Sequence, residues 1–323
     1  MLTIVMYHYV RNGSPVPART IEEFGRQLDH VASTYTIVRC ADVLAGGLPD
    51  NGCLLTFDDG LVEHGEYVAP ALERRGLTGC FCPAGRSTLE RRPLDAQKTQ
   101  FLLATLRDHE ALAQRVLERV AAARDDFDIP TDDELRARNT PTHAYDAPDA
   151  VLVKRLLQDG LPDPPRGHIL DELFAELVDD DEQAFAERIY LTLDDLRALA
   201  SRGMDIAAHG YEHRRLALLD EDAQRDEIAR SKELLAAILG TEPRAWTFSY
   251  PYGSRDATTR RLLAEAGCAL AFTTDPSRVG THDDLLELPR LDTNDIEDEV
   301  AKRYETPAAA GTSTGAARSG SAR

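Results

Sequence analysis

The sequence lacks an apolar run near the 18 residues that a membrane-spanning helix requires. Its first apolar run, which starts at Leu2, has no basic lead-in and is too short for the core of a signal peptide. Basic residues are scarce as well, since 37 Lys and Arg stand against 56 Asp and Glu and give a net charge of −19. A surface of that sign disfavours nucleic acid and anionic membranes as partners. We therefore expect a cytoplasmic protein with no transmembrane segment and no nucleic-acid partner.

Cysteine is also rare and carries no metal-binding or redox pattern. The five cysteines are an odd number and include no C-x-x-C pair. Cys53, Cys80 and Cys268 lie in or beside apolar runs, where cysteine behaves as a small hydrophobic residue. We expect reduced, buried thiols in a globular protein, which the 42% hydrophobic and 29% charged shares also favour.

Two neighbouring carboxylates follow a short apolar run at residues 53–57. Such a run is typical of a strand that is buried on both faces, and it ends in Asp58, Asp59 and Gly60. The same three residues are ordinary turn formers. Taken alone, this stretch leaves a catalytic and a purely structural role open.

Two later stretches end in comparable chemistry. The apolar run at 204–208 is followed by His209 and His213, and their i, i+4 spacing predicts two imidazoles on one side of a helical turn, as two ligands of one metal ion require. A further run, 246–250, closes on Pro251, Tyr252 and Gly253. In barrels of alternating strands and helices, functional sites are built at such strand ends.

The patterning divides the chain into four parts. Strand-like runs alternate with amphipathic helices in 1–87 and again in 191–305, which favours parallel βα units. Between them, 88–190 shows helical periods without a convincing strand, so we predict an all-helical insertion. Its role is left open between a solvated appendage and a lid or wall that narrows substrate choice. Residues 306–323, rich in Ala, Gly, Ser and Thr, are predicted to be a disordered tail.

Three motifs, taken in order, carry a resemblance to a known family. Residues 56–60 read Thr-Phe-Asp-Asp-Gly, residues 209–213 read His-x-x-x-His, and residues 250–253 read Tyr-Pro-Tyr-Gly. In this order they resemble the polysaccharide deacetylases with a NodB-homology domain (carbohydrate esterase family 4). The opening Met6-Tyr-His-Tyr-Val10 is similar to a run that often starts such domains. The resemblance covers roughly 1–86 and 190–292, and it implies an α/β fold: a distorted (β/α) barrel interrupted here by a large all-helical insertion.

The resemblance also implies an activity and a set of site residues. It implies a hydrolase that removes an N-acetyl group from an acetamido sugar or glycan precursor. Asp59, His209 and His213 would bind one divalent metal ion, with zinc as the first expectation and cobalt, nickel or another late first-row ion as alternatives. Asp58 would be the general base. The backbone N–H of Tyr252 would help to stabilise the oxyanion.

Two positions depart from the family pattern. Ser249 stands where many relatives have an arginine that orients the base aspartate, and no Leu-x-His supplies a general acid near the C-terminus, where His282 lies in another context. His8 is our substitute for that acid, with a role as a partner that orients an aspartate as the alternative. Arg290 and Asp292 are candidates to hold a catalytic group or to bind substrate.

Two other functions remain open from the sequence. One is hydrolysis of a non-sugar amide on the same scaffold, and the other is a catalytically silent carbohydrate-binding or scaffold protein. The presence of both aspartates and both histidines favours an enzyme over the silent protein.

Overall fold

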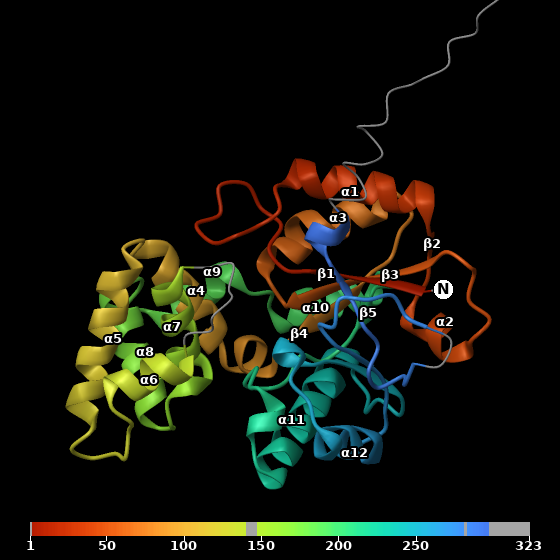
Figure 1. Cartoon of the computed structure of the whole chain (residues 1–323). Coiled ribbons are helices and arrows are strands. Elements are labelled where there is room, and N and C mark those ends of the chain that lie inside the picture. The colour runs from red at the N-terminus through yellow and green to blue at the C-terminus, as the bar shows by residue number, and fades with distance from the viewer. Residues whose placement is uncertain (1, 140–146, 281–282, 297–323) are drawn as a thin grey trace, which may run out of the picture.

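The fold alternates strands and helices at both ends of the chain and has a helical block between them (Figure 1). The computed structural model describes residues 2–139, 147–280 and 283–296. His282 and the predicted tail at 306–323 lie outside the described residues. Within them, no helix has both the length and the apolar character needed to cross a membrane. All five cysteines are buried.

The strands form two parallel sheets that are linked along their edges. The larger sheet has the order β5-β4-β3-β1-β8, with β2 also paired to β3. Its strands are β1 (Leu2–Tyr7), β2 (Thr36–Ile37), β3 (Gly52–Asp59), β4 (Cys80–Pro83), β5 (Asp205–Ile206) and β8 (Leu291–Asp292). The smaller sheet pairs β6 (Trp246–Ser249) with β7 (Cys268–Phe272). Isolated bridges link the smaller sheet to the segments beside the two edge strands of the larger one: Phe248 pairs with Ala208, just after β5, and Phe272 pairs with Leu288, before β8. The predicted α/β fold of this type is confirmed, with a ring of strands that is irregular and not continuously hydrogen-bonded.

Strand β3 lies at the centre of the larger sheet. All of its residues are buried, and it pairs with β1 on one edge and β4 on the other. The rings of Tyr7 and Phe57 stack at 5.2 Å between centroids, and those of Phe57 and Phe81 at 5.0 Å. Because this strand has neighbours on both edges and both faces, its side chains have no contact with water. This burial explains why the strand is mostly apolar up to the two aspartates at its end.

Helices cover the outside of the strands. They are α1 (Ile21–Thr34), α2 (Cys40–Ala45), α3 (Ala69–Glu73), α10 (Leu193–Ser201), α11 (Glu221–Leu239) and α12 (Ala257–Glu265). The Thr20 hydroxyl accepts a hydrogen bond from the Glu23 backbone N–H, and the Glu23 carboxylate accepts one from the Thr20 backbone, which together cap the start of α1. This capping box fixes where α1 begins.

The described part of 88–190 is helical and has an apolar core of its own. Its helices are α4 (Asp95–Thr105), α5 (His109–Ala123), α6 (Asp132–Asn139), α7 (Pro148–Arg155), α8 (Pro165–Leu177) and α9 (Glu182–Ile189). Side chains such as Leu112, Leu152 and Leu170 form this core. A second cluster joins Phe174 and Phe185 of the insertion to Tyr9 and Leu61 of the barrel. The boundaries of the four parts remain our proposal.

One buried histidine makes stability depend on pH. The ring of His64 packs against the rings of both Phe57 and Phe81, and its Nε2 is 2.9 Å from the carbonyl oxygen of His8. Burial lowers the pKa of His64 from 6.5 to about 4. Because the folded pKa is the lower one, His64 contributes stability above pH 6.5 that is lost as the pH falls toward 4.

We expect His64→Gln to remove this part of the pH dependence. Between about pH 7.5 and about pH 5, the free energy of unfolding of the wild type should fall by about 2 kcal/mol more than that of the variant. Urea unfolding in the presence of EDTA measures both, with the chelator excluding any contribution from bound metal. Parallel pH profiles for the two proteins would contradict the buried, neutral imidazole.

Candidate active site

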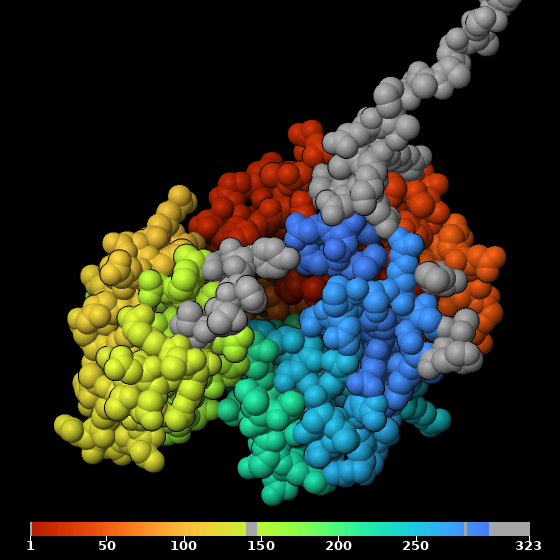
Figure 2. Space-filling view, in the orientation of Figure 1, coloured from red at the N-terminus to blue at the C-terminus, as the bar shows by residue number. Residues whose placement is uncertain are grey.

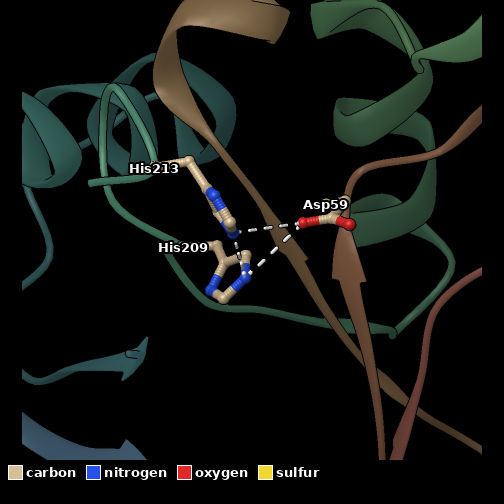
Figure 3. Close-up of side chains that lie close together, drawn as sticks. All are labelled: Asp59, His209 and His213. Carbon is tan, nitrogen blue, oxygen red and sulfur yellow. Dashed lines mark hydrogen bonds and ion pairs between the residues drawn. The ribbon is translucent and has the colours of Figure 1, made fainter. Parts of the chain in front are cut away.

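Three of the predicted site residues converge at the carboxyl ends of the strands. Asp59 is the last residue of β3, whereas His209 and His213 lie in the loop after β5. The two His Nε2 atoms are 3.1 Å apart. Asp59 Oδ1 lies 3.6 Å from His209 Nε2 and 3.5 Å from His213 Nε2. Figure 3 shows the three side chains pointing toward one another.

This triad fits a divalent metal ion by distance and by chemistry. A tetrahedral ion with bonds of about 2.1 Å holds its donor atoms about 3.4 Å apart, close to the separations of the three atoms here. Asp59 is buried, and its Oδ1 has no hydrogen-bond partner within the described residues. A buried carboxylate oxygen without a donor requires compensation, which a cation between it and the imidazoles would supply.

The two imidazoles are in the form that binds metal. The Nδ1–H of His209 donates to the carbonyl oxygen of Ser249 at 2.8 Å, which leaves the lone pair of Nε2 facing Asp59. Burial lowers the pKa of His209, and burial together with the nearby His209 lowers the pKa of His213 to about 3. Both rings are therefore neutral near pH 7.

The predicted helical turn between the two histidines is wrong. Residues 209–213 form an irregular loop, in which Gly210 has φ 74° and His213 has φ 58°. Glu227 of α11 holds this loop, because its carboxylate accepts the backbone N–H groups of Tyr211 at 2.9 Å and of Glu212 at 3.1 Å. Burial raises the pKa of Glu227 to about 7. The two imidazoles therefore come together because the backbone is left-handed at Gly210 and His213, and because the buried carboxylate of Glu227 holds the loop between them.

Left-handed backbone recurs at the site. Four non-glycine residues in the described ranges have positive φ, and three of them are Asp59 (74°), His213 (58°) and Tyr252 (57°). This conformation costs a side-chain-bearing residue about 1–2 kcal/mol. Strain of this kind persists only where surrounding contacts impose it, and its concentration here agrees with a functional site.

Asp58 is held by a buried arginine. The guanidinium of Arg290 donates to both carboxylate oxygens, at 3.0 Å and 2.8 Å, and the Ser249 hydroxyl donates at 3.2 Å. Burial alone would raise the pKa of Asp58, but the charge and hydrogen bonds of Arg290 hold it well below the usual range. Arg290, directly before β8, therefore orients this carboxylate, and Ser249, two residues before Pro251, adds only the hydroxyl.

The other predicted residues lie around this centre. The ring of Tyr252 packs against that of His213, at 4.7 Å between centroids, and the guanidinium of Arg215 lies 4.1 Å from the Tyr252 ring centre. His8 is half-buried after β1, and its charge is among the influences that lower the pKa values of Asp58 and His213. Asp292 bonds locally to Asn294 and does not join the group.

Two contributors were missed by sequence reasoning, Glu227 and Gln97. The amide Nε2 of Gln97, from α4 of the insertion, donates to Asp59 Oδ2 at 2.8 Å. Both residues fall inside ordinary helical periods, where a single polar residue carries no signal of a distant partner. Only the fold brings them to the site.

The insertion and the barrel enclose a polar cavity beside the triad. Its volume is about 210 Å³, and it is lined by Asp95, Asp159 and Arg166 from the insertion and by His213, Arg215 and Tyr252 from the barrel. Figure 2 shows the surface hollowed between these two parts of the chain. A substrate that reaches the triad through this cavity would touch residues of both.

Comparison with known proteins agrees with the motifs. Residues 179–271, which contain both histidines and Tyr252, match the family model described as polysaccharide deacetylase. This part of the chain is similar to the polysaccharide deacetylases. The family resemblance drawn from the motifs is therefore confirmed, although the matched segment does not include Asp58 and Asp59.

A curated protein with a similar sequence is YxkH of Bacillus subtilis (strain 168), which is named as a polysaccharide deacetylase. The two are 24% identical over 109 residues, which are 34% of this chain and 38% of YxkH. The match thus spans well under half of that relative.

Two solved structures have a similar fold over most of the chain. One is the deacetylase PplD of Streptococcus pyogenes in complex with acetate, with a TM-score of 0.53, 16% identity, and coverage of 90% of this chain and 91% of that one. The other is IcaB from Ammonifex degensii, with a TM-score of 0.55, 17% identity, and coverage of 93% and 95%. These similarities show the fold of the deacetylases across both barrel parts.

We expect the buried ion pair to be essential for folding stability. Arg290→Met leaves the Asp58 carboxylate buried without its cation and should lower the free energy of unfolding by about 3–5 kcal/mol, measured by urea unfolding. Arg26→Met, which breaks an exposed pair with Glu22, is the matched control and should change it by less than about 1 kcal/mol. Equal small losses in both variants would contradict the role of Arg290.

Proposed function

We propose that the protein is a metal-dependent hydrolase that removes the N-acetyl group from an acetamido sugar or a glycan precursor. The observation that carries the proposal is the pair of neighbouring carboxylates at the end of β3. Asp58 is bound by Arg290, whereas Asp59 Oδ1 faces two neutral imidazoles and has no hydrogen-bond donor of its own in the described residues. Two carboxylates in such different surroundings suit different tasks.

The ion that we propose is zinc, bound by Asp59, His209 and His213. One carboxylate and two imidazoles suit zinc or another late first-row ion, and three protein ligands leave a position open for reactants. When bound, such an ion lowers the pKa of water and polarises an acyl carbonyl. All three of these side chains are buried.

The remaining roles fall to groups around the triad. Asp58 accepts a proton from the attacking water, and its pairing with Arg290 keeps it ionised and oriented for that task. The Tyr252 backbone N–H stabilises the oxyanion, with the left-handed turn at this residue setting its direction. His8 donates a proton to the leaving amine, which its position after β1 supports.

The family segment at 179–271 supports a sugar substrate over another amide, because polysaccharide deacetylases are what it matches. PplD, whose fold is similar, was solved with acetate, the product that N-deacetylation releases. The polar lining of the cavity beside His213 also suits a hydroxyl-rich molecule.

The decisive assay follows acetate and free amine released from N-acetylated mono- and oligosaccharides by the zinc-loaded protein. We expect Asp58→Asn to retain the metal, since Asp58 is outside the triad, and to lower kcat by about 100-fold or more. Metal content and circular dichroism are measured on the same sample, so that loss of folding is recognised.

The control is Asp222→Asn, which changes an exposed carboxylate on α11 and should leave kcat unchanged. Loss of the metal in Asp58→Asn would contradict the division of roles between the two aspartates. Hydrolysis of simple acyl amides without any action on acetylated sugars would replace the sugar substrate with an amide. A metal-loaded protein inactive on both classes would favour a silent carbohydrate-binding protein.

A further inference from the structure

The insertion reaches the proposed metal site through one buried side chain. Gln97 is fully buried near the start of α4, and its Nε2 donates to Asp59 Oδ2 at 2.8 Å. A carboxylate oxygen can only accept, so the amide nitrogen is the atom that faces it. Figure 1 shows α4 nearer to the barrel than α5, which lies on the far side of the insertion.

The first turn of α4 is fixed on both sides of this contact. Asp95 binds Arg86 of the barrel side at 3.0 Å and Arg166 of the insertion at 2.6 Å. Lys98, next to Gln97 and fully buried, forms ion pairs with Asp171 of α8 and with Glu182 of α9. These ion pairs hold the backbone on both sides of Gln97 in place. A side chain that orients another residue needs such a fixed backbone.

The contact gives the two oxygens of Asp59 separate partners. Oδ2 accepts from Gln97, and Oδ1 faces the Nε2 atoms of His209 and His213. The terminal torsion of an aspartate is broad and weakly restricted by itself. A donor fixed on one oxygen therefore determines where the other oxygen points.

Folding stability does not explain a glutamine at this position. The Oε1 atom of Gln97 is buried without a hydrogen-bond partner within the described ranges. A buried amide that is only partly satisfied stabilises a fold less than an apolar side chain of similar volume. The polar group is accounted for by the carboxylate of Asp59, which it contacts, and by the neighbouring Tyr9 hydroxyl.

We propose that Gln97 is a positioning residue for Asp59 and that it increases the affinity of the triad for a divalent metal ion. The inference rests on the metal site proposed above. It makes the helical insertion a component of that site, because the insertion supplies the hydrogen bond that orients one of the three ligands. Partners of this kind behind a metal ligand typically change metal affinity by about 10- to 100-fold.

The test is zinc affinity of the full chain, measured by competition with a chromophoric chelator. Gln97→Met keeps the volume of the side chain and removes the donor, so its dissociation constant for zinc should rise about 10- to 100-fold. Gln97→Ala also removes the donor and is the second variant if Gln97→Met does not fold, because alanine is the strongest helix former. Thermal unfolding in EDTA reports on the metal-free fold of each protein.

The matched control is Gln100→Met, one turn further along the same helix. Gln100 accepts from the Tyr9 hydroxyl at 3.1 Å, and no hydrogen bond joins it to Asp59. Its zinc affinity should equal that of the wild type. Gln97 variants that fold and bind zinc as tightly as the wild type would overturn the inference while leaving the metal site intact. A wild type without zinc affinity would overturn both.

Discussion

Two buried carboxylates meet at the end of β3, and the site is arranged around giving each of them its own partner. Successive residues of a strand normally point to opposite faces, but the positive φ of Asp59 ends the strand and turns its carboxylate back. As a result, both carboxylates come within 4 Å of the same His209 Nε2, at 3.8 Å for Asp58 and 3.6 Å for Asp59. A buried carboxylate requires a positive partner or hydrogen-bond donors to compensate for its lost contact with water. Arg290 is that partner for Asp58, and a bound cation would be that partner for Asp59.

The convergence of the strand ends was predictable, whereas the contacts that complete the site were not. Apolar runs ending in Asp59 and before His209 indicate parallel strands whose carboxyl ends meet at one edge. The spacing of the histidines predicted a helical turn, and the structure has left-handed backbone at Gly210 and His213 instead. A histidine at positive φ is not readable from its neighbours, because the conformation is imposed by Glu227 from another helix. Arg290 was a candidate without a defined partner until the fold brought it to Asp58.

The helical insertion shows a different limit of sequence reasoning. Its apolar periods predict helices, and these pack around a core of their own. Those periods carry no information about which helix faces the barrel, so Gln97 looks like any polar residue within a helix. In the structure it donates to Asp59, while Asp159 pairs with Arg215, whose guanidinium covers Tyr252. The insertion thereby contacts the surroundings of both a proposed metal ligand and the proposed oxyanion donor, which a solvated appendage would not do.

The central claim is that Asp59, His209 and His213 form one metal site, and elemental analysis of the purified protein tests it most directly. The wild type is compared with an Asp59→Ala, His209→Ala double variant, both after incubation with zinc and removal of unbound ions. About one zinc ion per wild-type chain and none in the folded double variant is the result that the donor geometry predicts. No zinc in the wild type, or an equal amount in both proteins, would contradict the site and the hydrolytic mechanism derived from it.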